Sequence, residues 1–139
     1  MALDVAKAFR NELALATTAE AEGDVALAKH HLERAHILGQ RRYLSHIESH
    51  YRMLRLAMKQ SDGKEIRGQL TRLIGAGPFH LVGWVPLGNT GGADVSPVQP
   101  MPLPADIQPY FAGDSLRKGL LLRVIVLAML GAAYLLYLR

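Results

Sequence analysis

Apolar residues recur at intervals of three and four along the first 76 residues, which is the spacing of α-helices that pack through one face. Three short breaks interrupt this pattern: Gly23-Asp24, Gly39-Gln40 and Ser61-Asp62-Gly63. We predict a helix over residues 3–22, a second helix capped by Asp24, a third over residues 40–60 and a fourth that begins near residue 62. Because the connecting turns are short, these four helices should form a pair of antiparallel hairpins.

The apolar stripe of each later helix predicts which residues face the core. The stripes are Val25, Ala28, Leu32 and Ala35 in the second helix, Tyr43, Ile47, Tyr51, Leu54 and Met58 in the third, and Ile66, Leu70 and Leu73 in the fourth. We expect these residues to be buried between the helices.

A proline- and glycine-rich segment follows, and residues 77–113 contain all seven prolines of the chain. A segment of this length would be unusual as a plain connector, and Trp84 and Phe79 supply apolar area that it can bury. We therefore predict an ordered arm that ends in a polyproline-type spacer at residues 100–104. The loop at residues 88–92 (GNTGG) is an alternative anion-binding nest, although no lysine follows it.

Residues 119–138 form an apolar run that only Arg123 interrupts and that Arg139 closes. A helix of this length spans roughly 30 Å, the thickness of the hydrocarbon core of a bilayer. This run predicts a single-pass C-terminal transmembrane helix in the inner (cytoplasmic) membrane, with Arg117 and Lys118 keeping the N-terminal domain in the cytoplasm. The alternative is a buried C-terminal helix in an oligomer. The predicted fold class is all-α, with a helical domain (1–76), an arm (77–114) and an anchor (115–139).

Composition narrows the possible partners. The net charge is only +4, the basic residues alternate with acidic ones, and no aromatic residues are interleaved with them, so we expect no nucleic-acid binding. The absence of cysteine excludes disulfides and thiolate chemistry. The expected partners are membrane lipid and a protein, or a second copy of the chain, that packs on the small residues of the anchor (Ala128, Gly131 and Ala132).

Five of the six histidines lie between residues 30 and 50, and their spacing predicts a metal site. Glu33 and His36 share one face of the second helix, and His46 and His50 share one face of the third. A reversal of the chain near Gly39 would bring these four side chains together. Imidazole and carboxylate ligands suit a divalent transition metal such as zinc or iron, and a di-iron site would need further carboxylates, for which Glu12 and Glu48 are the candidates. The alternative is that the histidines are structural.

Two resemblances accompany these patterns. Residues 23–38 resemble one hairpin of a tetratricopeptide repeat, although two helical pairs are too few for a repeat array. The segments LERAHILGQ (32–40), VPLGNTGG (85–92) and PMPLP (100–104) resemble an uncharacterised bacterial family of short helical proteins with a domain of unknown function. This resemblance implies a single domain and no assigned activity.

No catalytic motif is present, so an enzyme is not our first interpretation. The first functional hypothesis is a membrane-tethered helical interaction module or a small accessory subunit of a membrane complex. The alternative is a metal-binding protein or metalloenzyme that uses Glu33, His36, His46 and His50.

Overall fold

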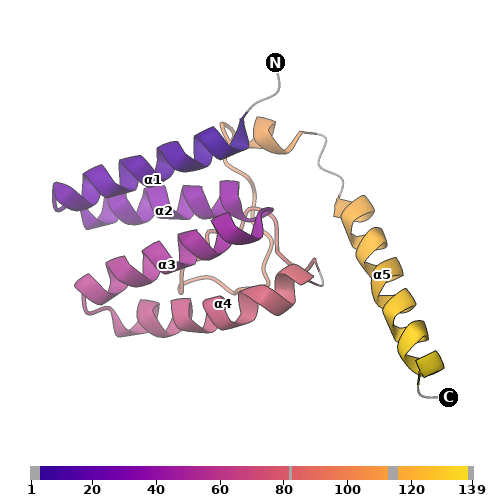
Figure 1. Ribbon diagram of the computed structural model, residues 1–139. Helices are drawn as coiled ribbons and strands as arrows, with labels where there is room; N and C mark the ends of the chain where they lie inside the picture. Colours follow the sequence, from indigo (N-terminus) through magenta and orange to yellow (C-terminus); the bar gives the residue numbers. More distant parts are fainter. Residues whose placement is uncertain (1–3, 82, 113–115, 138–139) are drawn as a thin grey trace.

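The computed structural model describes residues 4–81, 83–112 and 116–137, with the side chains of residues 116–123 left out (Figure 1). Its elements are α1 (Val5–Ala21), α2 (Val25–Gly39), α3 (Tyr43–Lys59), α4 (Gly63–Leu81), the 3-10 helix η1 (Gln108–Phe111) and α5 (Leu116–Tyr137). No strand occurs in these residues, which confirms the all-α class. The division of the chain into three domains stays a prediction, although α4 continues past residue 76 and through Pro78.

Local capping explains where the helices begin. The Asp24 side chain accepts a hydrogen bond from the Leu27 amide at 2.9 Å, which confirms the predicted cap of α2. Asp4 caps α1 in the same way. Asp62 accepts hydrogen bonds from the backbone at the start of α4, where a fourth helix was predicted.

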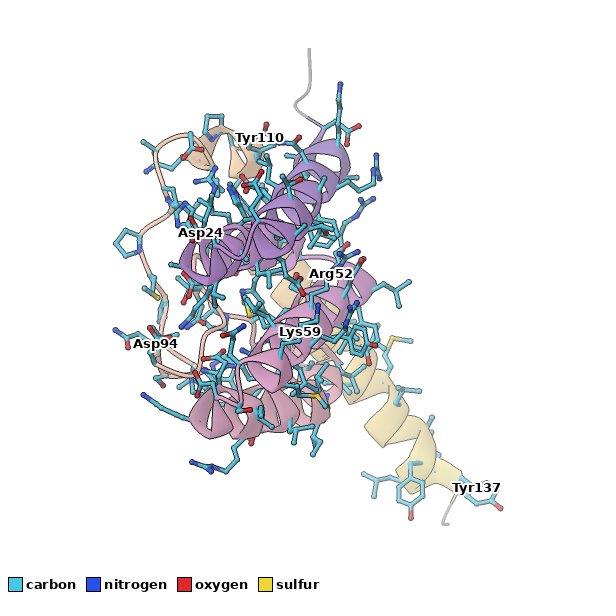
Figure 2. All side chains as sticks on the ribbon, turned by 90° about the vertical axis from the view of Figure 1, so that its left-hand side faces the viewer. Asp24, Arg52, Lys59, Asp94, Tyr110 and Tyr137 are labelled. Atoms are coloured by element: carbon cyan, nitrogen blue, oxygen red, sulfur yellow. The ribbon has the colours of Figure 1, made fainter. Side chains whose placement is uncertain are left out.

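The four helices pack in chain order, α1 against α2, α2 against α3 and α3 against α4, with neighbours antiparallel (Figure 1). The core cluster comprises Phe9, Leu13, Ala16, Ala19, Ala28, Leu32, Ala35, Ile37, Leu38, Met53, Leu56, Ile107 and Phe111. Since Ile107 and Phe111 belong to the arm, the arm helps to close the core at one edge. Figure 2 shows the arm between Asp94 and Tyr110 running along one side of the helices.

The predicted apolar stripes of α3 and α4 are mostly wrong: of their residues only Leu54 is buried, and the buried face of each helix is shifted by about one residue. The buried residues of α3 are His46, Ser49, His50, Met53, Leu54, Leu56 and Ala57, and those of α4 are Glu65, Gln69 and Ala76. Tyr51, Met58 and Leu70 are exposed instead. One residue corresponds to a rotation of about 100° around a helix, so α3 and α4 present a partly polar face to the interior. The stripe of α2 was predicted correctly: Ala28, Leu32 and Ala35 are buried.

The predicted transmembrane helix is wrong, and with it the inner-membrane location and the orientation. Among the helices in the described part of the chain, none is long and apolar enough to cross a membrane. In the sequence of α5, Arg117, Lys118 and Arg123 fall in the first third. Within α5, the apolar stretch after Arg123 runs from Val124 to Tyr137, roughly 20 Å, which is short of a bilayer's hydrocarbon core.

Other anchor predictions fall outside the described residues, namely Arg139 and the side chains of Arg117, Lys118 and Arg123. The described side chains of α5, from Val124 to Tyr137, are all exposed. The predicted partners, membrane lipid and a protein bound through the anchor, remain untested predictions that were inferred from the span.

Candidate metal centre

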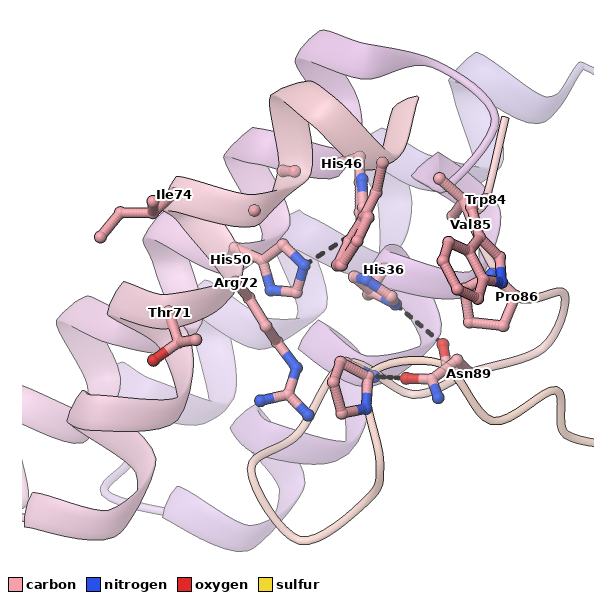
Figure 3. A pocket seen from close by; sticks show the side chains of 15 residues that line it. His36, His46, His50, Thr71, Arg72, Ile74, Trp84, Val85, Pro86 and Asn89 are labelled. Atoms are coloured by element: carbon pink, nitrogen blue, oxygen red, sulfur yellow. Dashed lines mark hydrogen bonds between the residues drawn. The ribbon is translucent and has the colours of Figure 1, made fainter. Parts of the chain in front are cut away.

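Three buried histidines from α2 and α3 meet between the helices (Figure 3). The ring centroids of His36, His46 and His50 form a nearly equilateral triangle with sides of 4.7, 4.6 and 4.7 Å. One nitrogen of each ring lies within 4.8 Å of the others, and the three residues are at most 6% exposed. His46 and His50 share a face because they lie four residues apart, and the short turn after α2 brings His36 opposite them.

The arm fixes the tautomer of His36. Its Nδ1 lies 2.8 Å from the carbonyl oxygen of Asn89, and because a carbonyl only accepts, Nδ1 must carry the proton. The Nε2 of His36 is then an unprotonated acceptor. It is buried and has no hydrogen-bond partner among the described residues.

Gln69 of α4 fixes the tautomer of His50. The side-chain nitrogen of Gln69 donates to Glu65 Oε1 at 2.6 Å and to the Gly91 carbonyl at 2.9 Å, and both of these groups only accept. The amide oxygen of Gln69 must therefore face His50 Nδ1, at 2.7 Å, which makes Nδ1 the donor. The Nε2 of His50 is left with a lone pair and lies beside His46 Nε2.

His46 Nε2 lies 3.1 Å from His50 Nε2. This separation fits a hydrogen bond donated by His46. It equally fits two ligands of one metal ion, since nitrogens at about 2.0–2.1 Å from a zinc ion and 3.1 Å apart subtend an angle of about 100°. Nitrogens on a tetrahedral zinc lie about 3.3 Å apart, so the widest pair here would close by at most about 1.5 Å. The ring of His80 packs on His46 with a centroid distance of 5.0 Å.

All three histidines are neutral near pH 7. Burial lowers the pKa of His46 to about 3, with the neighbouring His50 and His80 adding to the effect. Burial lowers the pKa of His50 to about 4, and it moves the pKa of His36 well below its usual value. The neutral imidazole is the form that binds metals.

A pocket of about 340 Å³ opens onto the three rings (Figure 3). Its walls are mostly apolar and include Phe79 of α4 and Trp84 and Pro86 of the arm. Arg72 is the charged residue in the lining, and no lining residue is acidic. The side chain of Arg72 donates to the carbonyl oxygens of Gly92 (2.8 Å) and Val95 (2.6 Å).

The structure brings together three of the four predicted ligands. Glu33 lies apart from the three rings, and its carboxylate is 3.8 Å from Lys29 Nζ, close to Asp94 and Glu65. Burial raises the pKa of Glu33. The two further carboxylates that a di-iron site would need are also engaged elsewhere: Glu12 with Arg34 and His31, and Glu48 with Arg52. The ligand set itself stays a prediction.

Sequence reasoning missed Gln69 and Arg72, and it considered Asn89 and Gly91 only as part of the alternative anion-binding nest at residues 88–92. The available signal was weak, because the polar Gln69 falls within a helix whose apolar residues point elsewhere. Gly91 is required by close packing: with φ at +80°, a Cβ there would lie 2.7 Å from the His36 ring. The amide of Gly91 donates to the Asn89 side chain at 2.9 Å, so in the described structure this loop supports His36.

The fold and the site define an all-helical protein with a buried cluster of three imidazoles at the foot of an apolar pocket. The chain belongs to the family described as "Protein of unknown function (DUF3703)", which matches residues 3–111. This match confirms the predicted membership of an uncharacterised family. No curated protein and no solved structure matches the chain.

Proposed function

We propose that the protein binds one divalent transition metal ion through His36, His46 and His50. The observation that supports this most is the arrangement of ring nitrogens. Hydrogen bonds from Nδ1 of His36 and of His50 leave both Nε2 atoms unprotonated. The Nε2 of His50 lies 3.1 Å from His46 Nε2, and the Nε2 of His36 is buried without a hydrogen-bond partner among the described residues. Metal-bound histidines commonly donate their other ring nitrogen to a carbonyl or carboxylate oxygen, which fixes the ring as Asn89 and Gln69 do here.

The donor set favours zinc over iron. Three neutral imidazoles with an open fourth position are the ligand arrangement of many catalytic zinc sites. Mononuclear non-haem iron sites usually combine two histidines with a carboxylate, and no acidic residue lines this pocket. Copper(II) binds nitrogen ligands more tightly than zinc does, so the metal must be identified in protein that acquired it inside cells.

The test is elemental analysis of the full chain, purified without a histidine tag. We expect close to one zinc ion per chain. The metal-free protein should regain zinc with an affinity tighter than micromolar, and its melting temperature should rise with zinc concentration because the ion binds only the folded state. If the purified protein carries no metal, and zinc, cobalt, nickel and copper all fail to bind, the proposal is wrong.

Matched variants separate a ligand from an ordinary histidine. His46→Gln and His50→Gln keep a polar side chain in the cluster and should each weaken zinc binding by 100-fold or more while circular dichroism shows an intact helical domain. His30→Ala is the control, because His30 lies on the same helix as His36 but is exposed. Equal zinc binding by all these variants would contradict the assignment. The interaction-module hypothesis stays a prediction with no contact in the described residues to support it.

A further inference from the structure

The charge around the three histidines is unbalanced once a metal is present. A divalent ion held by three neutral imidazoles keeps its charge of about +2. Arg72 adds a second cationic group, because it lines the same pocket as the three histidines. None of the described residues that line the pocket is acidic, so none of them supplies a counter-ion inside it.

The surroundings of Arg72 also favour the binding of an anion in the pocket. Its guanidinium is half-buried, and its hydrogen bonds within the described structure go to the neutral carbonyl oxygens of Gly68, Gly92 and Val95. The negative charges of Glu65 and Asp94 interact with Arg72, but neither residue lines the pocket. Burial lowers the pKa of Arg72, which means that its charged form is incompletely compensated. An anion inside the pocket would be stabilised by both cations in surroundings of low polarity.

The rest of the pocket suits an apolar group. Phe79 and Trp84 pack edge to face at 6.0 Å, and Val85 and Pro86 extend the same wall. The side chain of Trp84 is 60% exposed, so it has free area to cover a ligand. A volume of about 340 Å³ is at the lower end of the range for small-molecule sites and leaves room for a ring-sized body beside the metal.

We propose that this pocket binds a small organic anion, whose charged group occupies the fourth position of the metal beside Arg72 and whose apolar body packs against Phe79 and Trp84. This inference rests on the proposed metal site. It assigns the ligand class as an aromatic or branched aliphatic carboxylate, or a group of the same shape and charge. Inorganic anions and acetate share the charged group but lack the body.

The experiment uses the full chain loaded with cobalt(II), whose visible absorption reports the ligands of the metal. Trp84 is the only tryptophan of the chain, so its fluorescence reports the occupancy of the pocket. Benzoate, acetate and benzyl alcohol are titrated in parallel. We expect benzoate to change both signals and to bind at least tenfold more tightly than acetate, because burying a phenyl ring raises affinity by about 10- to 100-fold. Benzyl alcohol, which lacks the charge, should bind at least tenfold more weakly than benzoate.

Two variants locate the two halves of the ligand. Arg72→Gln should weaken benzoate binding by tenfold or more and leave benzyl alcohol binding unchanged. Phe79→Ala should weaken benzoate but leave acetate unchanged. Melting curves confirm that each variant is folded.

Equal binding of benzoate and acetate, equal binding of benzoate by wild type and Arg72→Gln, or undiminished benzoate binding by metal-free protein would each overturn the inference. In all three cases the visible absorption of bound cobalt(II) would still show nitrogen ligands, so the proposed metal site would remain supported. If cobalt, zinc, nickel and copper all fail to bind, both proposals fall.

Discussion

The orientation of one buried amide decides whether His50 can act as a ligand, and Gln69→Glu tests it. Gln69 is fully buried (0% exposed). Its nitrogen donates to Glu65 Oε1 and to the Gly91 carbonyl, and its oxygen accepts from His50 Nδ1. The substitution has nearly the same shape but replaces the nitrogen by a second oxygen. Two acceptors that now receive hydrogen bonds, at 2.6 and 2.9 Å, would then face another acceptor.

The magnitude follows from these contacts. A buried acceptor left without its donor costs about 1–3 kcal/mol, and a second carboxylate four residues after Glu65 adds like-charge repulsion. We expect the free energy of unfolding of the metal-free protein to fall by about 3–5 kcal/mol. Urea denaturation at pH 7, followed by circular dichroism, measures it. The hydrogen bond from His50 survives in the variant, because a carboxylate oxygen accepts as well as an amide oxygen does.

The control is a double variant in which residues 65 and 69 exchange their side chains. In the double variant Glu65→Gln, Gln69→Glu, the new amide on residue 65 can donate to the new carboxylate, while the Gly91 carbonyl remains unpaired. The double variant should therefore be more stable than the sum of the single changes predicts, with a coupling energy of about 1–2 kcal/mol. The amide would be reversed if the free energy of unfolding of Gln69→Glu lay within about 1 kcal/mol of the wild-type value, which is roughly the error of such a comparison, or if the coupling energy were absent. The proton of His50 would then sit on Nε2, and the metal site as drawn would be wrong.

Four further outcomes are expected. Gly91→Ala places a Cβ 2.7 Å from the His36 ring at a backbone φ of +80°, so it should lower the free energy of unfolding by about 2–4 kcal/mol in urea and weaken zinc binding as well. Ser61 is the one described non-glycine residue with positive φ (+54°), at the end of α3, and Ser61→Gly should raise the free energy of unfolding by about 0.5–1 kcal/mol. Gly23 occupies the same position after α1, at φ +80°, so Gly23→Ser should have the opposite effect, and equal stability of both variants in the same assay would contradict the reasoning. Removing zinc with a chelator should lower the melting temperature of wild type but not that of His50→Gln, as differential scanning calorimetry can show.

The helices and turns could be predicted because their signals are local. Asp24 and Asp62 cap the helices that follow them through hydrogen bonds to amides two or three residues away, so neighbouring residues were sufficient to place both starts. The pairing of His36 with His46 was also within reach, because a short turn between helices brings nearby residues opposite each other. In all these cases the partners lie close together in the sequence.

The buried face of α3 and α4 could not be predicted in the same way. Hydropathy places Tyr51 and Leu70 inside, whereas the structure buries the residue before each of them, His50 and Gln69. Gln69 can be buried because the arm supplies a partner from 22 residues away, the carbonyl of Gly91, and the Gln69 oxygen in turn accepts from His50 Nδ1. Nothing in the periodicity of a helix indicates that such a partner exists. The prediction of a C-terminal transmembrane helix was wrong because the apolar run was judged by its total length, although Arg123 divides it.

Helices α3 and α4 bury polar side chains, and this burial is an argument for a functional site at this place in the fold. The helices α3 and α4 leave Tyr51, Met58 and Leu70 exposed, while the interior contains three imidazoles, a glutamine and a carboxylate. The Nε2 of His36 is buried and has no hydrogen-bond partner within the described residues, which is the state that a ligand nitrogen would have before an ion binds. Departures of this kind from local preference are characteristic of functional sites. Two of the segments that carry the family resemblance meet at this point, in the hydrogen bond from His36 to Asn89. A metal ion bound at this cluster, as proposed above, would pair the Nε2 of His36 and would use the tautomers of His36 and His50 that Asn89 and Gln69 fix.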